Sequence, residues 1–110
     1  MTVRELADKL SLTVRAGTDG LDLDVSGCYI GDLLSLAMSG ISKSNVWITI
    51  QTSVNIVAVS VLTEGACVIL CASQEPDDNA KKKADIEGVP LLVSDKSAYE
   101  LAVMISKLGI

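Results

Sequence analysis

The chain has 110 residues, of which 49% are hydrophobic, and it carries a net charge of −5. A chain of this length and composition can bury a core without staples, so we expect one ordered domain over residues 1–110 and exclude a disordered chain. Nine basic residues against fourteen acidic ones, with only three aromatic residues, do not provide a phosphate-binding surface, so we expect no nucleic-acid partner.

The N-terminal part predicts a helix followed by short strands. Thr2 and Glu5 have the spacing of a capping box, and apolar residues recur at helical spacing over 3–10. Apolar and acidic residues alternate over 21–25, which is typical of a half-buried strand. We expect Asp32 to cap the next helix. The elements predicted after the first helix are strands at 12–16 and 21–25 joined by a turn at 17–20, an extended pair at 29–30, and a helix over 33–39.

The second half predicts alternating strands and helices. Residues 54–62 have high β-propensity, yet we predict a helix there, because parallel strands at 46–50 and 66–72 need a crossover connection. The elements that follow are a helix from Pro76 to Glu87, a strand over 89–93, and a helix capped by Ser97. This order predicts an α/β layered domain with a central, largely parallel sheet of about five strands flanked by helices.

The predicted helix over 54–62 is apolar nearly all the way round. A helix of this kind is covered on both sides. In a chain this short, we expect the second cover to be another copy of the chain, and therefore a homodimer. The residues predicted at this dimer interface are Ile56, Val57, Val59 and Val61.

Polar and glycine residues stand where predicted strands end. Gly31 and Asp32 open a predicted helix, and Gln51 and Thr52 follow the strand 46–50. Open α/β sheets bind ligands at the carboxyl ends of their strands, and helix N-termini attract anions. We expect a small anionic ligand such as a nucleotide; ordinary capping and turn chemistry is the alternative.

Catalytic and metal-binding groups are scarce. The chain has no histidine, which removes the common triads and imidazole metal ligands. Cys67 and Cys71 are four residues apart on a predicted strand, about 13 Å, which is too far for a disulfide or a shared metal. The reactivity of Cys28 stays open. We expect no catalytic residue, no metal and no cofactor.

The sequence contains no apolar run of the roughly 18 residues that span a membrane, and its amphipathic N-terminal pattern leads us to expect no signal peptide. Its three cysteines do not suggest a disulfide framework. We therefore expect a cytoplasmic protein with no membrane partner.

Residues 24–28, Asp-Val-Ser-Gly-Cys, resemble the five-residue signature of the DRTGG domain family, and four further segments are also similar to it: 46–52, 55–59, 90–92 and 97–102. The resemblance extends to the N-terminal domain of HPr kinase/phosphorylase. It implies an accessory module that is regulatory or structural and that can form dimer contacts. Val25 stands in place of the signature arginine, and Cys28 in place of its second glycine.

Together these features predict a non-catalytic regulatory or ligand-sensing homodimer that acts without an attached CBS or catalytic domain. Two alternatives remain: a small accessory enzyme or phosphotransfer component that uses the turns near Gly27 and Thr52, and a scaffold subunit that binds a separate protein partner. The complete set of expected ligand-binding residues, with the matched signature positions included, is Asp24, Ser26, Gly27, Gly31, Asp32, Gln51, Thr52 and Asn55.

Overall fold

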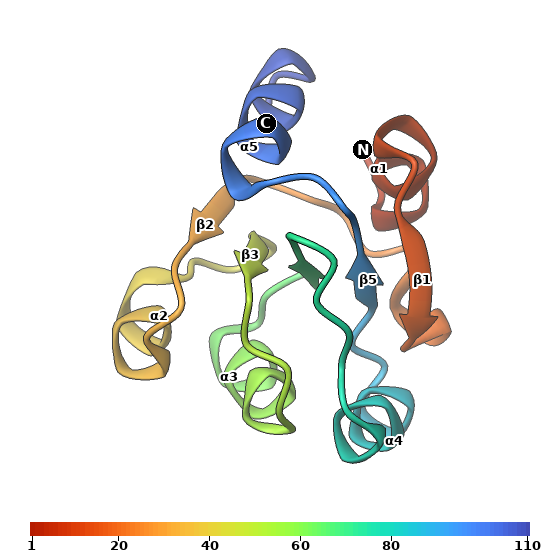
Figure 1. Cartoon of the computed structure of the whole chain (residues 1–110), viewed down its shortest axis with the longest axis vertical. Helices are drawn as coiled ribbons and strands as arrows, with labels where there is room; N and C mark the ends of the chain where they lie inside the picture. The colour runs from red at the N-terminus through yellow and green to blue at the C-terminus, as the bar shows by residue number, and fades with distance from the viewer.

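A five-stranded sheet separates two layers of helices in the computed structural model, which describes residues 1–110 (Figure 1). The strand order is β1-β5-β4-β3-β2, and only β1 runs antiparallel to its neighbour. The strands are β1 (Thr13–Ala16), β2 (Cys28–Ile30), β3 (Val46–Thr49), β4 (Cys67–Leu70) and β5 (Leu91–Val93). The helices are α1 (Val3–Leu10), α2 (Leu34–Gly40), α3 (Asn55–Thr63), α4 (Asp78–Glu87) and α5 (Ala98–Lys107), with a short 3₁₀ turn at Thr18–Gly20. The predicted α/β class and the mostly parallel five-stranded sheet are confirmed.

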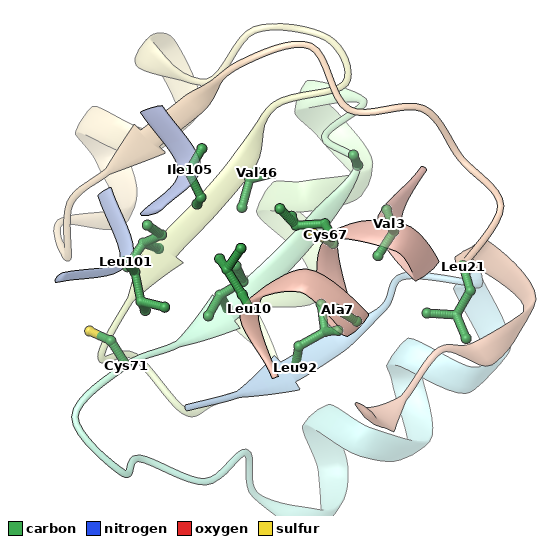
Figure 2. Packing of buried hydrophobic residues seen from close by; sticks show 14 residues of the cluster. Val3, Ala7, Leu10, Leu21, Val46, Cys67, Cys71, Leu92, Leu101 and Ile105 are labelled. Carbon is green, nitrogen blue, oxygen red and sulfur yellow. The ribbon is translucent and has the colours of Figure 1, made fainter. Parts of the chain in front are cut away.

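The core consists of two apolar layers, one on each face of the sheet. Helices α1 and α5 cover one face, while α2, α3 and α4 cover the other (Figure 1). Figure 2 shows side chains of α1 and α5 directed toward sheet residues such as Val46 and Leu92. On the other face, Trp47 and Val68 pack with the buried side of α3. Because β4 is central and covered on both faces, all four of its residues are buried, which explains its uninterrupted apolar sequence.

Three helices begin with side-chain caps. Thr2 and Ser97 form complete capping boxes with the glutamates three residues later, as predicted. Asp77 accepts a hydrogen bond from the Ala80 amide and caps α4. These caps satisfy amide groups that a helix leaves free in its first turn.

No helix in the structure has the length and apolar character required to cross a bilayer.

The segment 21–25 does not join the sheet, so the predicted strand there is wrong. Its carbonyl groups instead accept hydrogen bonds from the first turn of α1: the Val3 amide donates to Leu23 at 2.9 Å and the Arg4 amide to Leu21 at 2.8 Å. One isolated bridge joins Thr2 to Asp24. The free amides at a helix N-terminus therefore compete successfully with a strand partner for this segment.

The helix predicted over 54–62 is confirmed, since α3 spans Asn55–Thr63 and connects β3 to β4. The dimer-interface residues expected on it need correction. Ile56 and Val57 are 0% exposed and Val59 is 4% exposed within one chain, because the sheet and the neighbouring helices already cover them. Of the four, only Val61 is exposed, so any partner must contact a different side of α3.

Candidate functional site

The structure divides the eight predicted ligand residues between the two ends of the short edge strand β2. Asp24, Ser26 and Gly27 precede the strand, whereas Gly31 and Asp32 follow it. Gly27 and Gly31 are four residues apart, which is about 13 Å of extended chain. One site that contains all eight residues is therefore not formed. The expectation is corrected to two groups, one at the amino ends of the parallel strands (the amino edge) and one at their carboxyl ends (the carboxyl edge).

The amino-edge group is held by backbone contacts to the loop before β3. The Ser26 amide donates to the Ser44 carbonyl at 2.9 Å, and the Ser26 hydroxyl donates to the Lys43 carbonyl at 2.9 Å. The Val46 amide donates to the Gly27 carbonyl at 2.8 Å. Gly27 has φ of +146°, a conformation that side chains rarely adopt. The signature-like segment therefore acts as a bend that brings the chain into β2.

At the carboxyl edge, Asp32 joins the loops that follow β2 and β3. One carboxylate oxygen accepts hydrogen bonds from the Thr49 hydroxyl at 2.9 Å and from the Ile50 amide at 3.0 Å. The Gln51 side-chain amide donates to the Asp32 carbonyl at 2.7 Å. Asp32 does not cap α2, because Leu33 occupies the N-cap position without a side-chain bond. The predicted cap is therefore wrong, and the carboxylate instead links the loops that follow β2 and β3.

Trp47 also positions this edge, which the sequence interpretation missed. Its side chain is 1% exposed, and its indole N–H donates to the Gly31 carbonyl at 2.9 Å. A buried indole N–H usually donates to a hydrogen-bond acceptor. The single Trp in a buried strand was therefore the sequence feature that could have indicated this contact. Together with Asp32, Trp47 fixes the Gly31 loop from two sides.

The other carboxyl-edge residues lie on the loop before α3 or at the start of that helix. The Thr52 carbonyl accepts a hydrogen bond from the Asp77 amide at 3.0 Å, which connects this loop to the start of α4. Asn55 is the first residue of α3 and is exposed. Gly31, Asp32, Gln51 and Thr52 thus stand on adjacent loops at one edge, next to Asn55 at the start of α3.

A hollow of about 310 Å³ opens at the opposite, amino edge, between the ends of α3 and α4. We call it the amino-edge pocket, and Asp24 is its only lining residue among the predicted ligand residues. The remaining members were missed because they are far apart in the sequence and meet only through the fold. Those that matter below are Lys43, Ser60, Glu64, Gly65, Glu87 and Gly88.

A second hollow of about 280 Å³ lies beside the end of β5 and contains an ion pair. The Arg15 guanidinium and the Glu75 carboxylate are 2.7 Å apart. The hydrogen bond from Arg15 is the main cause that lowers the pKa of Glu75. Arg15 and Glu75 therefore neutralise each other, and the Asp95 carboxylate is the one further charge that lines this hollow.

The thiols are held in their protonated form. Cys28 is exposed as a residue, but partial burial of its thiol raises its pKa to about 11, and complete burial raises the pKa of Cys67 far above the usual range. Burial also raises the pKa of Cys71, with a smaller contribution from the nearby Asp32 carboxylate. The thiolate is the reactive form of cysteine, so none of the three is an activated nucleophile near neutral pH. No three His, Cys, Asp or Glu side chains are grouped so that they could hold a metal ion.

Comparison with protein-family models finds no match. A search of curated proteins also finds no match.

A solved structure nevertheless has a similar fold. It contains the CBS and DRTGG domains of the regulatory region of Clostridium perfringens pyrophosphatase, in complex with the activator diadenosine tetraphosphate. The TM-score is 0.77 at 11% sequence identity, and the match covers 94% of this chain and 45% of that one. The chain thus spans less than half the length of this structural neighbour. At such low identity the likeness establishes a related fold alone.

Proposed function

We propose that the chain is a non-catalytic regulatory module of the DRTGG type, a homodimer that senses a small anionic ligand such as a nucleotide. The observation that carries this proposal is the likeness, over 94% of the chain, to a regulatory region that was crystallised with a nucleotide activator. The resemblance of residues 24–28 to the family signature supports the same assignment. The protonated thiols and the absence of histidine favour a sensing role over a catalytic one.

The carboxyl edge is the proposed ligand site. Gly31, Gln51 and Thr52 stand there on adjacent loops, and Asn55 is the first residue of α3 beside them. The Asp32 carboxylate would repel an anion, but one of its oxygens is already directed at Thr49 and Ile50. We therefore assign Asp32 a positioning role and leave Asp24, Ser26 and Gly27, at the other edge, out of this site.

Thermal unfolding with diadenosine tetraphosphate, ATP or AMP tests the ligand. At about 100 times its dissociation constant, a ligand adds about 2.7 kcal/mol of stability, which corresponds to roughly 10 °C in Tm for a chain of this size. Asn55→Asp adds a negative charge at the site with little change in shape, and it should reduce the shift. Ser26→Ala, at the opposite edge, is the control and should leave the shift unchanged. No shift with any of the three nucleotides would reject a nucleotide sensor and favour the scaffold alternative.

The solvent side of α3 is the proposed dimer surface. Val54, Ala58, Val61 and Leu62 form a stripe at positions i, i+4, i+7 and i+8, which places them on one side of the helix. Leu62 is 68% exposed, and apolar residues are exposed on the neighbouring helix α2 as well. Exposed apolar surface of this extent commonly marks an interaction site. We call this surface the α2–α3 face.

The charge pattern of the α2–α3 face favours a second copy of the chain as its partner. No charged residue occurs between Asp32 and Lys43, or between Lys43 and Glu64. The net charge of −5 therefore comes from residues outside the stretches that form this face. Two copies can meet through it without like-charge repulsion, as a two-fold symmetric interface requires.

Sedimentation equilibrium at micromolar concentration tests the dimer. We expect the wild-type chain to be a dimer and Leu62→Glu to be a monomer, because the substitution places two like charges at a symmetric apolar contact. Ile86→Glu is the matched control: Ile86 is 77% exposed on α4, outside the α2–α3 face, and the variant should remain dimeric. A monomeric wild-type chain, or a dimeric Leu62→Glu variant, would contradict this surface.

A further inference from the structure

We infer that the amino-edge pocket binds a small organic cation that carries ammonium or guanidinium groups. The pocket lies at the opposite edge of the sheet from the proposed anion site. The inference is independent of the proposed function, because it concerns different residues and the opposite ligand charge.

The first observation is a buried hydroxyl that faces the pocket. Ser60 is 2% exposed, lines the pocket, and its hydroxyl makes no hydrogen bond within the chain. Every side-chain oxygen or nitrogen that is fully buried in the molecule has a hydrogen-bond partner. Because the Ser60 hydroxyl has none, it must keep some contact with solvent. A methyl group added at Gly65, another lining residue, would lie 3.3 Å from the Ser60 oxygen, which shows that this oxygen is directed toward Gly65. A hydroxyl so placed is available to a ligand.

The second observation is that the C-terminal ends of two helices border the pocket. Helix α3 ends at its C-cap Glu64, and α4 ends at its C-cap Gly88. Some of their last carbonyl groups already accept hydrogen bonds, since the Ser60 carbonyl accepts from the Gly65 amide and the Ala84 carbonyl from the Val89 amide, but together they form the negative end of each helix dipole. Both ends therefore favour a positively charged ligand and disfavour an anion.

The side chains of the pocket have the same charge preference. Three carboxylates, from Asp24, Glu64 and Glu87, line it together with a single ammonium group, from Lys43. Glu87 also pairs with Lys83 at 3.1 Å, whereas neither Asp24 nor Glu64 is in an ion pair. Asp24 and Glu64 thus give the pocket two unpaired negative charges against the single positive charge of Lys43.

The size and the donor pattern restrict the cation. About 310 Å³ is at the small end of the range for ligand sites. The carboxylates are not grouped as the ligands of one metal ion. Carbonyl groups, carboxylates and a hydroxyl spread around a hollow suit a ligand with several N–H donors, which ammonium and guanidinium groups provide.

Three probes of equal chain length separate charge from shape: 1,4-diaminobutane, 1,4-butanediol and succinate. Each is titrated into the ¹⁵N-labelled full chain at neutral pH while backbone amide shifts are recorded. We expect saturable shifts at Gly65, Gly88 and Val89 with the diamine, and none with the diol or the dicarboxylate. Shifts of equal size with the diol, or no shifts with the diamine, would overturn the inference.

Variants localise the binding. Asp24→Asn combined with Glu64→Gln should weaken diamine binding about tenfold, because two charge-assisted contacts are lost. Asp8→Asn combined with Asp78→Asn removes the same charge elsewhere and should leave binding unchanged. Gly65→Ala places a methyl against the Ser60 hydroxyl without requiring a positive φ, and should also weaken binding. Equal affinity in all three variants would overturn the site, and the amide spectrum of each variant shows whether it is folded.

Discussion

Removing the Asp32 carboxylate should destabilise the fold by an amount that the local hydrogen bonds predict. In Asp32→Ala, the Thr49 hydroxyl and the Ile50 amide lose their common acceptor. Ile50 is exposed, so water can replace that bond, but Thr49 is only 1% exposed. A buried donor without a partner costs about 1–3 kcal/mol, so we expect a loss of about 2 kcal/mol, or roughly 8 °C in Tm. Asp32→Asn keeps an oxygen acceptor and should lose about half as much.

Urea unfolding with a double-mutant cycle measures this effect. Thr49→Val removes the hydroxyl that needs the carboxylate, so the double variant Asp32→Ala with Thr49→Val should lose less stability than the sum of the two single variants. The expected coupling is about 1 kcal/mol. Additive losses, or an Asp32→Ala loss below about 0.5 kcal/mol, would show that the carboxylate does not hold the two loops together.

Three further predictions concern backbone space, acid stability and thiol reactivity. Gly17 and Gly88 have φ of +74° and +67°, but an added Cβ would lie 1.9 Å from the Val89 carbonyl oxygen at Gly17 and 3.8 Å from its nearest neighbour at Gly88. In urea unfolding we therefore expect Gly88→Ala to lose about 1–2 kcal/mol and Gly17→Ala clearly more, and equal losses would contradict this. The pKa of Glu75 is lowered, mainly by the hydrogen bond from Arg15, so its stabilising contribution is present above pH 4.5 and is lost as the pH falls below it. The stability difference between wild type and Arg15→Met should accordingly shrink between pH 6 and pH 3, and a constant difference would refute the pair. With its pKa raised to about 11, Cys28 should react slowly with a disulfide reagent at pH 7 and faster at higher pH, and rapid modification at pH 7 would contradict the protonated state.

Part of the fold followed from local patterns and topology together. The helix α3 was predicted against its β-propensity because parallel strands on either side of it require a crossover. The segment 21–25 shows the limit of the alternation rule. Its pattern is that of a half-buried strand, yet its carbonyl groups bind the first turn of α1. The pattern did not predict these backbone partners, and it also predicted a buried Leu23, which is 49% exposed in the structure.

The candidate sites depended still more on the fold. The sequence placed Gly31, Asp32, Gln51 and Thr52 at strand ends, which a register argument can predict. It could not show that Asp24 would line one pocket together with Glu64 and Glu87, since the fold brings the segment before β2 and the ends of α3 and α4 together. It also assigned Ile56, Val57 and Val59 to a partner, when the chain's own sheet and helices cover them.

By itself, the sequence determined the α/β class, the parallel strands β3, β4 and β5, and the capped starts of α1 and α5, because periodicity and capping act over a few neighbouring residues. Only the tertiary structure decided which side of α3 meets solvent, which backbone groups 21–25 binds, and where the acidic side chains meet. These outcomes depend on competition among surfaces and hydrogen-bonding groups that are distant in the chain, and no local pattern records the result of that competition.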